Sequence, residues 1–425
     1  MTTVRRVCLV SGGTGGHLMP ALVLARAMRG RGHLPLLVTE GREVEREILR
    51  RELPDVREVR LPPAARVRLA LPIWLVRATF AARRLLREHG IDDVVITGGR
   101  PSVPVGLAAR SLGLPLYLLE QNAVMGRANR WLQRFARRVY QGLPFAHQGL
   151  PFAAVPSAGG AGERRRFVLT GTPLRSGIGS ISRAEARAML GLDDEAPVVL
   201  VTGGSQGAQS LNQIVPRALL ALDRPLQVLH LAGMGRDEAV RVLYAGGRLV
   251  AHVRPVALDM DRMLAAADLV ICRGGGTTVA ELAAVGRPAV IVPYPHHKDR
   301  QQLHNARVLA DRGAAIVIEE PQLSPETLRQ FLAALFDDPA RLLAMASAAK
   351  QLHTVDAVDR ILGDMGLLSE GGGLLTEGGL QNEVGQPAAG DRRGAAVVAP
   401  PRSGPALPVP TGRVAEPSAH RGRAG

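Results

Sequence analysis

The chain has 425 residues, of which 46% are hydrophobic and 3% aromatic, and its formal net charge at pH 7 is +15. So few aromatic residues argue against a base-stacking platform for nucleic acid, and no apolar run approaches the roughly 20 residues of a membrane-spanning helix. We therefore expect a soluble protein of two domains, whose basic surface suits phosphorylated substrates or anionic membranes and which has no nucleic-acid partner. Because no signal-peptide pattern precedes the first strand, we expect the protein in the cytoplasm.

The N-terminal segment predicts the start of a doubly wound parallel sheet. Residues 7–10 form a strand, residues 11–17 a glycine loop of sequence SGGTGGH, and residues 20–30 a helix that begins at a proline and ends at glycines. Such a loop can bind a phosphate through its backbone amides, although it also occurs where a helix packs closely on a strand. His17 ends the loop, where an imidazole can act as a base, donate to an anion or cap the helix.

Residues 34–39 predict a strand and residues 43–52 a charged helix, and both precede an apolar segment at 69–80. One interpretation of this segment is an amphipathic helix that packs on the sheet. The other is a patch in which Trp74 and Phe80 enter a membrane interface while neighbouring arginines meet anionic headgroups. The arginines in and around the segment are Arg66, Arg68, Arg77, Arg83 and Arg84.

Two more strands are predicted at 93–96 and 114–119, and they lead into the polar segments TGGRPS (97–102) and EQN (120–122). In a parallel sheet both segments reach the same edge, where ligands of α/β proteins bind. A Pro-, Ala- and Gly-rich stretch at 149–163 and a last strand from residue 167 precede a hinge, so we place the domain boundary after residue 173. Cys8 lies on a predicted buried strand, as does Cys272, and we expect both to be core residues and not a disulfide or a metal pair.

The second half repeats the pattern, with a strand at 198–202, the loop GGSQGA at 203–208 and a helix from about residue 209. Asp259 and Asp261 have the spacing of a metal-binding pair, but acidic residues are also simply favourable where a helix begins. We therefore expect no metal or other cofactor.

The segment with the most candidate binding residues runs from 268 to 305. It has a strand at 269–271, glycines at 274–276, an alanine-rich helix and a strand at 288–293. The glycines and the first free amides of the helix favour a diphosphate. Glu281, one turn into the helix, has two interpretations: it forms a capping box with Thr278, or it accepts hydrogen bonds from the vicinal hydroxyls of a ribose. Gln301 and Gln302 can donate and accept, which suits sugar hydroxyls.

From residue 366 onward the composition shifts to Gly, Pro, Ala and Arg without periodicity. We expect a disordered basic tail at 366–425 with no catalytic role.

In combination, the motifs at 12–17, 120–122, 203–208, 272–281 and 299–302 closely resemble those of the MurG family of UDP-N-acetylglucosamine transferases, over residues 7–363. The resemblance implies the α/β GT-B fold, in which two Rossmann-like domains with parallel sheets face each other across a cleft. Residues 1–173 would form the acceptor- and membrane-facing domain, completed by a helix near 340–363. Residues 174–340 would form the domain that binds UDP-GlcNAc.

The resemblance further implies an inverting transfer of GlcNAc from UDP-GlcNAc to the 4-hydroxyl of undecaprenyl-diphospho-MurNAc-pentapeptide, without a cofactor. This is a step of peptidoglycan synthesis, and hence of cell wall biogenesis and cell division, at the cytoplasmic face of the cell membrane. His17 is the first candidate for the general base. Glu281 would hold the ribose, the backbone of Ala257 the uracil, and Gln301 the amino sugar. The residues that correspond to donor contacts are Thr14, Gly15, Gly16, Asn122, Arg175, Ser205, Ala257, Gly276, Thr277, Thr278, Val279, Ala280, Glu281 and Gln301.

The chain departs from the family pattern at two places on the acceptor side. Leu119 stands where the family has a histidine, and segment 98–102 lacks the family's tyrosine, for which Arg100 would substitute in part. With Trp74, Arg77 and Phe80, Arg100 completes the expected acceptor and membrane residues. Two other functions stay open: a related GT-B enzyme that glycosylates another lipid such as diacylglycerol, and a membrane-associated protein that binds nucleotide sugars with little activity.

Overall fold

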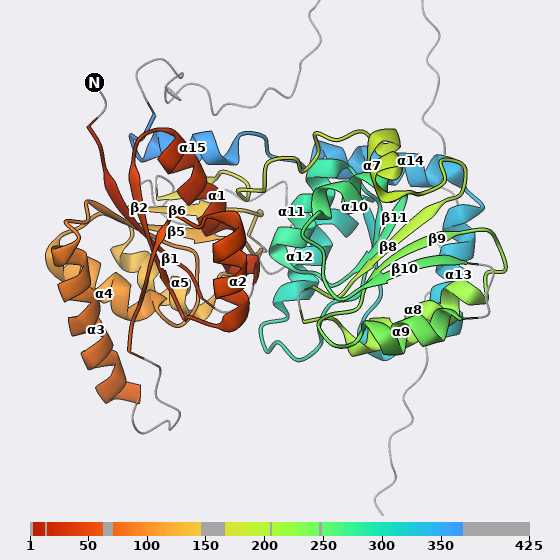
Figure 1. The fold of residues 1–425 in the computed structure, drawn as a ribbon, viewed down its shortest axis with the longest axis horizontal. Coiled ribbons are helices and arrows are strands. Elements are labelled where there is room, and N and C mark those ends of the chain that lie inside the picture. The colour runs from red at the N-terminus through yellow and green to blue at the C-terminus, as the bar shows by residue number, and fades with distance from the viewer. Residues whose placement is uncertain are drawn as a thin grey trace, which may run out of the picture. The chain divides into compact units, whose positions relative to one another are not determined.

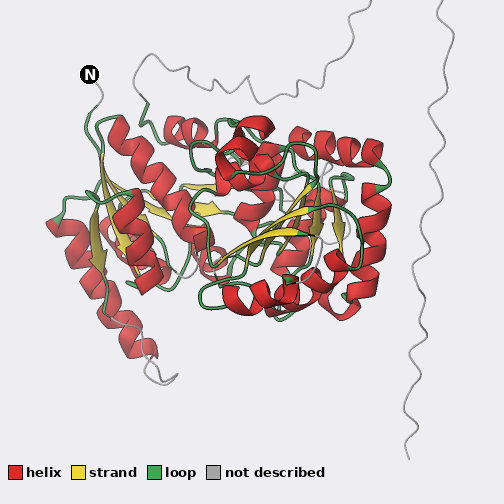
Figure 2. Cartoon of the chain, turned by 45° about the vertical axis from the view of Figure 1, so that its right-hand side comes forward, coloured by secondary structure: helices red, strands yellow, loops and turns green. Residues whose placement is uncertain are grey.

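The computed structural model describes residues 3–12, 15–62, 71–145, 166–204, 206–245 and 249–368. Thr14, Ser205, Arg66 and Arg68 lie outside the described residues, as does nearly all of the expected tail. The chain forms two parallel sheets, each with helices on both faces (Figures 1 and 2).

The N-terminal sheet has seven parallel strands in the order β3-β2-β1-β4-β5-β6-β7. Strands β1, β2, β4 and β5 are short, mainly apolar runs, as expected for strands that are buried on both faces, whereas the edge strand β3 is polar and partly exposed. The register pairs Val10 of β1 with Val38 of β2 and with Ile96 of β4, so the loops after these three strands leave from one edge. The strand bounds are β1 Arg6–Val10, β2 Leu34–Thr39, β3 Arg57–Arg60, β4 Asp93–Ile96, β5 Leu116–Glu120, β6 Arg138–Gln141 and β7 Phe167–Leu169.

Helices α1 (Gly15–Gly30), α2 (Glu43–Glu52) and α15 (Ala357–Asp364) share one core of this sheet, and α3 (Leu71–Glu88), α4 (Ser102–Leu112) and α5 (Arg127–Leu132) share the other. A short 3-10 helix, η2 (Gln133–Phe135), follows α5. Leu367 was assigned to the tail by composition, but it is fully buried in the first of these cores. Its burial, with that of Ile361 and Leu362, fixes the last part of the described chain to the N-terminal sheet.

The C-terminal sheet has six parallel strands in the order β10-β9-β8-β11-β12-β13. Thr202 pairs with both Leu231 and Cys272, so the loops after the three central strands again share one edge. The strand bounds are β8 Val198–Thr202, β9 Gln227–Leu231, β10 Val250–Arg254, β11 Leu269–Cys272, β12 Ala289–Ile291 and β13 Ala315–Val317.

One core of the C-terminal sheet contains residues of α7 (Arg183–Leu190), α10 (Met260–Ala266), α11 (Gly276–Val285) and α12 (Gln301–Ala310). The other contains residues of α8 (Gln209–Leu220), α9 (Asp237–Tyr244) and α13 (Pro325–Phe336), and α14 (Pro339–Gln351) contributes to both. The 3-10 helix η3 (Glu320–Gln322) precedes α13. Cys8 and Cys272 are fully buried in separate cores, as predicted.

Segment 340–363, for which we expected one helix, contains two. Helix α14 packs on the C-terminal half and α15 on the N-terminal sheet, and Asp356 between them has a positive φ of 60°. The chain thus leaves the N-terminal sheet after β7 and returns to it with α15. We propose on this basis that the first domain ends near residue 173 and that the second continues past the expected limit of 340 to the end of α14.

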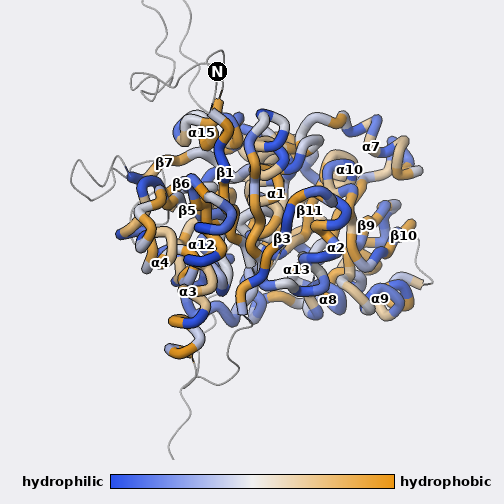
Figure 3. Tube along the Cα trace, turned by 60° about the vertical axis from the view of Figure 1, so that its left-hand side comes forward, coloured by the Kyte–Doolittle hydropathy of each residue, from blue (hydrophilic) through white to orange (hydrophobic). Residues whose placement is uncertain are grey.

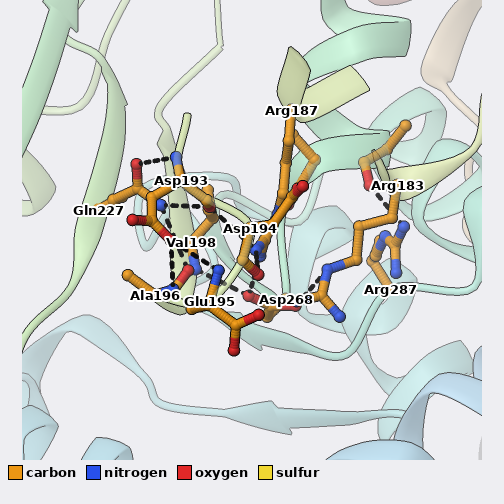
Figure 4. Close-up of polar contacts among 12 residues, drawn as sticks. Arg183, Arg187, Asp193, Asp194, Glu195, Ala196, Val198, Gln227, Asp268 and Arg287 are labelled. Atoms are coloured by element: carbon orange, nitrogen blue, oxygen red, sulfur yellow. Dashed lines mark hydrogen bonds and ion pairs between the residues drawn. The ribbon is translucent and has the colours of Figure 1, made fainter. Parts of the chain in front are cut away.

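Arg187 on α7 is fully buried and ties together the edge of the C-terminal sheet that lies opposite the glycine loops (Figure 4). Its guanidinium donates to Asp268 Oδ2 over 2.6 Å and to the backbone carbonyls of Ala266, Asp193 and Asp194. Asp268 Oδ2 also accepts the amide of Val198 over 2.8 Å, at the start of β8. Four of the five N–H donors of this buried cation thus have partners within the protein, which indicates a structural role.

We expect Arg187→Met to lower the free energy of unfolding by about 2 kcal/mol, because the buried Ala266 carbonyl loses its donor and Asp268 loses a buried cationic partner. Urea denaturation measures the change. Arg183→Met is the matched control, since Arg183 also pairs with Asp268 but its side chain is 48% exposed. The control should cost less than about 0.5 kcal/mol. Equal losses in the two variants would contradict the structural assignment of Arg187.

Candidate functional site

The first amides of α11 have no side-chain cap. Helix α11 begins at Gly276, and its N-cap residue Gly275 has no side chain. A Cβ on Gly276 would lie 2.3 Å from the carbonyl oxygen of Gln121, so only glycine allows the N-terminal half to approach the helix start so closely. Free amides and the positive end of the helix dipole favour an anion such as a diphosphate here. Val279 and Ala280 of the same helix are buried, and the Val279 amide donates to the Gly275 carbonyl over 2.9 Å.

Glu281 lies in the second turn of α11 and is only 8% exposed. The capping-box interpretation is wrong, because the N-cap is Gly275, not Thr278, and Glu281 lies too far along the helix to cap it. Burial raises the pKa of Glu281 to about 7, and the nearby charge of Arg175 partly opposes this. A buried carboxylate of this kind can accept hydrogen bonds from a ligand's hydroxyl groups.

Arg175 joins two of the predicted donor residues. Its Nη2 lies 4.0 Å from Glu281 Oε1, and its Nη1 donates to the carbonyl of Leu258 over 3.2 Å. Leu258 follows Ala257, which packs partly buried against the same core as α11. The structure therefore brings Arg175, Glu281 and the Ala257 segment together.

Segment 120–124 of the N-terminal half contacts α12 of the C-terminal half. Asn305, fully buried on α12, donates to Asn122 Oδ1 over 3.0 Å and to the Gly274 carbonyl over 2.9 Å, and it accepts from the Ala123 amide over 2.7 Å. One turn earlier, Gln301 Nε2 donates to the carbonyl of Val124 over 3.2 Å. Asn122 and Gln301, both predicted as donor contacts, are thus close together. Gln302 accepts the Tyr294 amide instead and supports the loop after β12.

Sequence reasoning assigned no role to Asn305 or Glu120. The Glu120 carboxylate is buried and accepts from the amide and side chain of Asn122, from the Gly126 amide and from Asn129. It therefore holds the loop that presents Asn122. The position of Asn305, four residues after Gln301 on one helix face, is the signal that predicts a shared site.

Helix α1 begins at Gly15 and not at Pro20, where we expected it. Pro20 lies in the second turn and has no N–H to donate to the Gly16 carbonyl. The hydroxyl of Thr277 on α11 donates to that carbonyl over 3.1 Å. The two glycine loops on either side of the site, 11–17 and 272–277, are therefore linked directly.

His17 lies in the first turn of α1, and its Nδ1 is 3.1 Å from the carbonyl of Gly12. Because a carbonyl only accepts, Nδ1 carries the proton in the neutral ring and Nε2 has a free lone pair. A Cβ on Gly98 would lie 2.9 Å from Nε2, so Gly98, with a φ of 136°, leaves room for the ring. This geometry suits a general base.

The two departures from the family pattern have different surroundings. Leu119 is fully buried in the N-terminal core, where an apolar side chain fits. The amide of Arg100 donates to Glu40 Oε1 over 3.1 Å, and its side chain is exposed beside the loop that covers His17. Trp74, Arg77 and Phe80 are not part of this site, because α3 packs on α4, on the opposite face of the N-terminal sheet from α1.

Among the residues that the structure describes, no group of three His, Cys, Asp or Glu side chains is arranged to hold a metal ion. Asp259 is paired with Arg254 over 3.2 Å, at the start of α10.

Two Rossmann-like parallel-sheet domains, with glycine loops and helix starts without side-chain caps at the site, define a glycosyltransferase of the GT-B class. Residues 7–141 match the N-terminal domain of glycosyltransferase family 28, and residues 198–361 match its C-terminal domain. A relative from Halorhodospira halophila is 41% identical over 84% of this chain and 97% of its own length, and one from Rhodospirillum centenum is 40% identical over 85% and 95%. Both are named UDP-N-acetylglucosamine–N-acetylmuramyl-(pentapeptide) pyrophosphoryl-undecaprenol N-acetylglucosamine transferase.

The crystal structure of Acinetobacter baumannii MurG has a TM-score of 0.69 to this chain at 31% identity, and the match covers 85% of this chain and 99% of that one. A UDP-N-acetylglucosamine 2-epimerase from Listeria monocytogenes matches with a TM-score of 0.62 at 15% identity, over 85% and 96%, which shows a shared fold alone. The chain belongs to the MurG family within glycosyltransferase family 28.

Proposed function

We propose that the chain transfers GlcNAc from UDP-GlcNAc to the 4-hydroxyl of undecaprenyl-diphospho-MurNAc-pentapeptide, with inversion, in peptidoglycan synthesis. The observation that carries the proposal is the buried Glu281 beside Arg175 near the uncapped start of α11, with His17 on the facing loop. A carboxylate for ribose hydroxyls, amides for a diphosphate and a base for an acceptor hydroxyl are the groups that this reaction needs.

The site residues have the following roles in this proposal. The amides of Gly276, Thr277 and Thr278 and those that follow the 203–208 loop stabilise the diphosphate as it leaves. Asn122 and Gln301 contact the amino sugar. The remaining donor contacts are Thr14, Gly15, Gly16, Arg175, Ser205, Ala257, Val279, Ala280 and Glu281.

His17 Nε2 takes the proton of the acceptor hydroxyl as its oxygen bonds to the anomeric carbon. The bond from that carbon to the β-phosphate oxygen breaks, and UDP leaves with the electron pair. Attack from the side opposite to UDP gives the β-1,4 linkage. Arg100 lies near His17 and would contact the acceptor where the family has a tyrosine.

Transfer of labelled GlcNAc from UDP-GlcNAc to a short-chain analogue of the muramyl-pentapeptide lipid tests the function. A parallel reaction with diacylglycerol tests the related GT-B activity on another lipid. Product with the muramyl lipid alone supports the proposal. Product with diacylglycerol alone, or UDP-GlcNAc binding without product on either lipid, overturns it in favour of the other enzyme or of a nucleotide-sugar-binding protein.

The protein would reach its lipid substrate as a peripheral protein on the cytoplasmic face of the cell membrane. No helix in the described part of the chain is long and apolar enough to cross a bilayer. Helix α3, whose trace includes hydrophobic residues (Figure 3), instead exposes apolar side chains, among them Ile73, which is 66% exposed, and Phe80, which is 68% exposed. Arg77 is exposed on the same helix, and the Trp74 indole donates to the carbonyl of Pro62. An apolar surface with basic neighbours suits an anionic membrane.

We expect the double variant Ile73→Ser, Phe80→Ser to bind at least about tenfold more weakly to vesicles that contain anionic phospholipid, since two apolar side chains no longer enter the interface. Sedimentation with vesicles measures the change. The control is Leu343→Ser on α14, because Leu343 is 73% exposed but belongs to the C-terminal half. Unchanged binding of the double variant would show that α3 is not the membrane contact.

A further inference from the structure

A buried histidine on β9 connects two helices of the C-terminal sheet. His230 is fully buried, with Nδ1 2.9 Å from the hydroxyl of Tyr244 on α9 and Nε2 3.1 Å from Oδ1 of Asn212 on α8. Asn212 Nδ2 in turn donates to the carbonyl of Ala232 over 2.8 Å. Helices α8 and α9 lie on the same face of the sheet (Figure 1), and His230 of β9 contacts one residue of each.

The donors and acceptors in this series of hydrogen bonds are fixed by the Ala232 carbonyl, which ends it. The Ala232 carbonyl can only accept, so the Asn212 amide must turn its nitrogen toward it and its oxygen toward His230. That oxygen also only accepts, so His230 Nε2 must carry the proton. Nδ1 is then an acceptor, and the Tyr244 hydroxyl donates to it. Burial lowers the pKa of His230 to about 4, so the neutral ring persists near pH 7.

The Ala232 carbonyl, which ends this series of hydrogen bonds, lies against the glycine loop that follows β8. A Cβ on Gly207 would lie 2.0 Å from the Ala232 oxygen, and one on Gly233 would lie 2.7 Å from the Gly207 Cα. On its other side, the Ala232 amide donates to the Arg254 carbonyl over 2.9 Å, and the Gly233 amide donates to the Pro255 carbonyl over 2.8 Å. The turn after β9 is therefore a fixed backbone support for Gly207.

The supported loop, residues 203–208, leads into α8, whose N-cap Ala208 offers no side-chain cap to the first amides. The Gly207 amide donates to the Gly204 carbonyl over 2.9 Å, so a shift of Gly207 moves the turn as a whole. An error of a fraction of an ångström in these amides weakens their hydrogen bonds to a diphosphate.

We propose that His230 is a positioning residue for nucleotide binding: through Asn212 and the Ala232 carbonyl it fixes Gly207 and the start of α8 in the geometry that receives the donor diphosphate. This inference rests on the proposed function for the identity of the ligand. His230 contacts no substrate and takes no part in the chemical step.

Hydrogen–deuterium exchange tests the positioning without any ligand. In His230→Phe the ring is retained but both hydrogen bonds are lost, and we expect the amides of residues 204–211 to exchange about tenfold faster through local opening. His230→Gln keeps an N–H that can reach Asn212 and should restore most of the protection. Leu335→Ala is the control, because Leu335 is fully buried in the same core but belongs to α13. It should lower stability and leave the exchange of the loop unchanged.

Calorimetric titration with UDP gives the functional result. We expect His230→Phe to raise the Kd for UDP about tenfold, equivalent to about 1.4 kcal/mol, with His230→Gln and Leu335→Ala close to the unaltered chain. If folded His230→Phe shows unaltered exchange and affinity, or if Leu335→Ala loosens the loop equally, the positioning role is wrong. If the unaltered chain binds no UDP, the proposed function fails, and the exchange comparison still decides the role of His230.

Discussion

Replacing Glu281 by alanine should lower kcat/KM for UDP-GlcNAc by about 100-fold, and most of the loss should lie in donor binding. The carboxylate is buried in the second turn of α11, where two hydroxyls of a ribose would each donate to it. A hydrogen bond to a charged group contributes about 1.5 kcal/mol or more, so two contribute about 3 kcal/mol. Steady-state kinetics with varied UDP-GlcNAc and the short-chain lipid acceptor measure the change.

The same residue should make donor binding depend on pH. In the free protein the pKa of Glu281 is raised to about 7 from an ordinary value of 4.5, so part of the population is protonated at pH 6.5. Hydroxyl donors favour the ionised form, so the affinity for UDP-GlcNAc should rise from pH 6 to pH 8, with release of a proton on binding. Calorimetry in two buffers of different ionisation enthalpy detects that proton.

Glu281→Gln is the control for this pH dependence, because it keeps the shape and removes the titration. The raised pKa also makes the stability of the ligand-free protein depend on pH, in the direction opposite to that of the affinity for UDP-GlcNAc. Because the folded-state pKa lies above the unfolded value, the ligand-free protein binds more protons than the unfolded chain between about pH 4.5 and 7, so this group's contribution to stability falls as pH rises through that window. An affinity that is flat from pH 6 to 8 in the unaltered chain would contradict the placement of Glu281 against the donor.

Replacing His17 by alanine should lower kcat by about 100- to 10,000-fold, the range that general-base catalysis supplies. The Gly12 carbonyl directs the Nδ1 proton and leaves Nε2 as the free basic nitrogen. The KM for UDP-GlcNAc should change little, since the His17 side chain is not among the proposed donor contacts. Single-turnover measurements with saturating donor separate the chemical step from binding.

His89→Ala is the matched control, since it removes an imidazole from the end of α3, away from the site. His17→Asn adds a sharper comparison, because an amide can donate to the Gly12 carbonyl but cannot take a proton from the acceptor. Both His17 variants should lose turnover. Intact turnover in His17→Ala would show that another group accepts the proton.

The fold was largely predictable because residues that break strands and helices mark the ends of many elements. Strand β2, helix α2 and strand β8 have the predicted bounds, since each is an apolar or charged run flanked by Gly, Pro or polar residues. The start of α1 was misplaced because proline favours a first turn, whereas here the loop glycines already adopt the helix.

The site was predictable where backbone chemistry defines it and less so where tertiary partners do. Glycine loops and helix starts follow from sequence spacing, and they placed Gly276 and Glu281 correctly relative to one another. Asn305 and Arg187 act through partners up to 183 residues away in the sequence, so their roles depend on tertiary contacts. The partners of Glu120 lie within nine residues, in the loop after β5 and in α5. Burial of Leu119 likewise depends on which core its strand faces.

Pro20 has a consequence for attempts to make this protein more robust. A substitution such as Pro20→Ala removes a proline from a helix interior, which stabilises most helices, and would be chosen by any procedure that optimises each element by itself. Here it also supplies an N–H that competes with the Thr277 hydroxyl for the Gly16 carbonyl. The substitution would thus stabilise helix α1 but weaken the hydrogen bond that links the two nucleotide-facing loops, so the more stable variant would be a poorer catalyst.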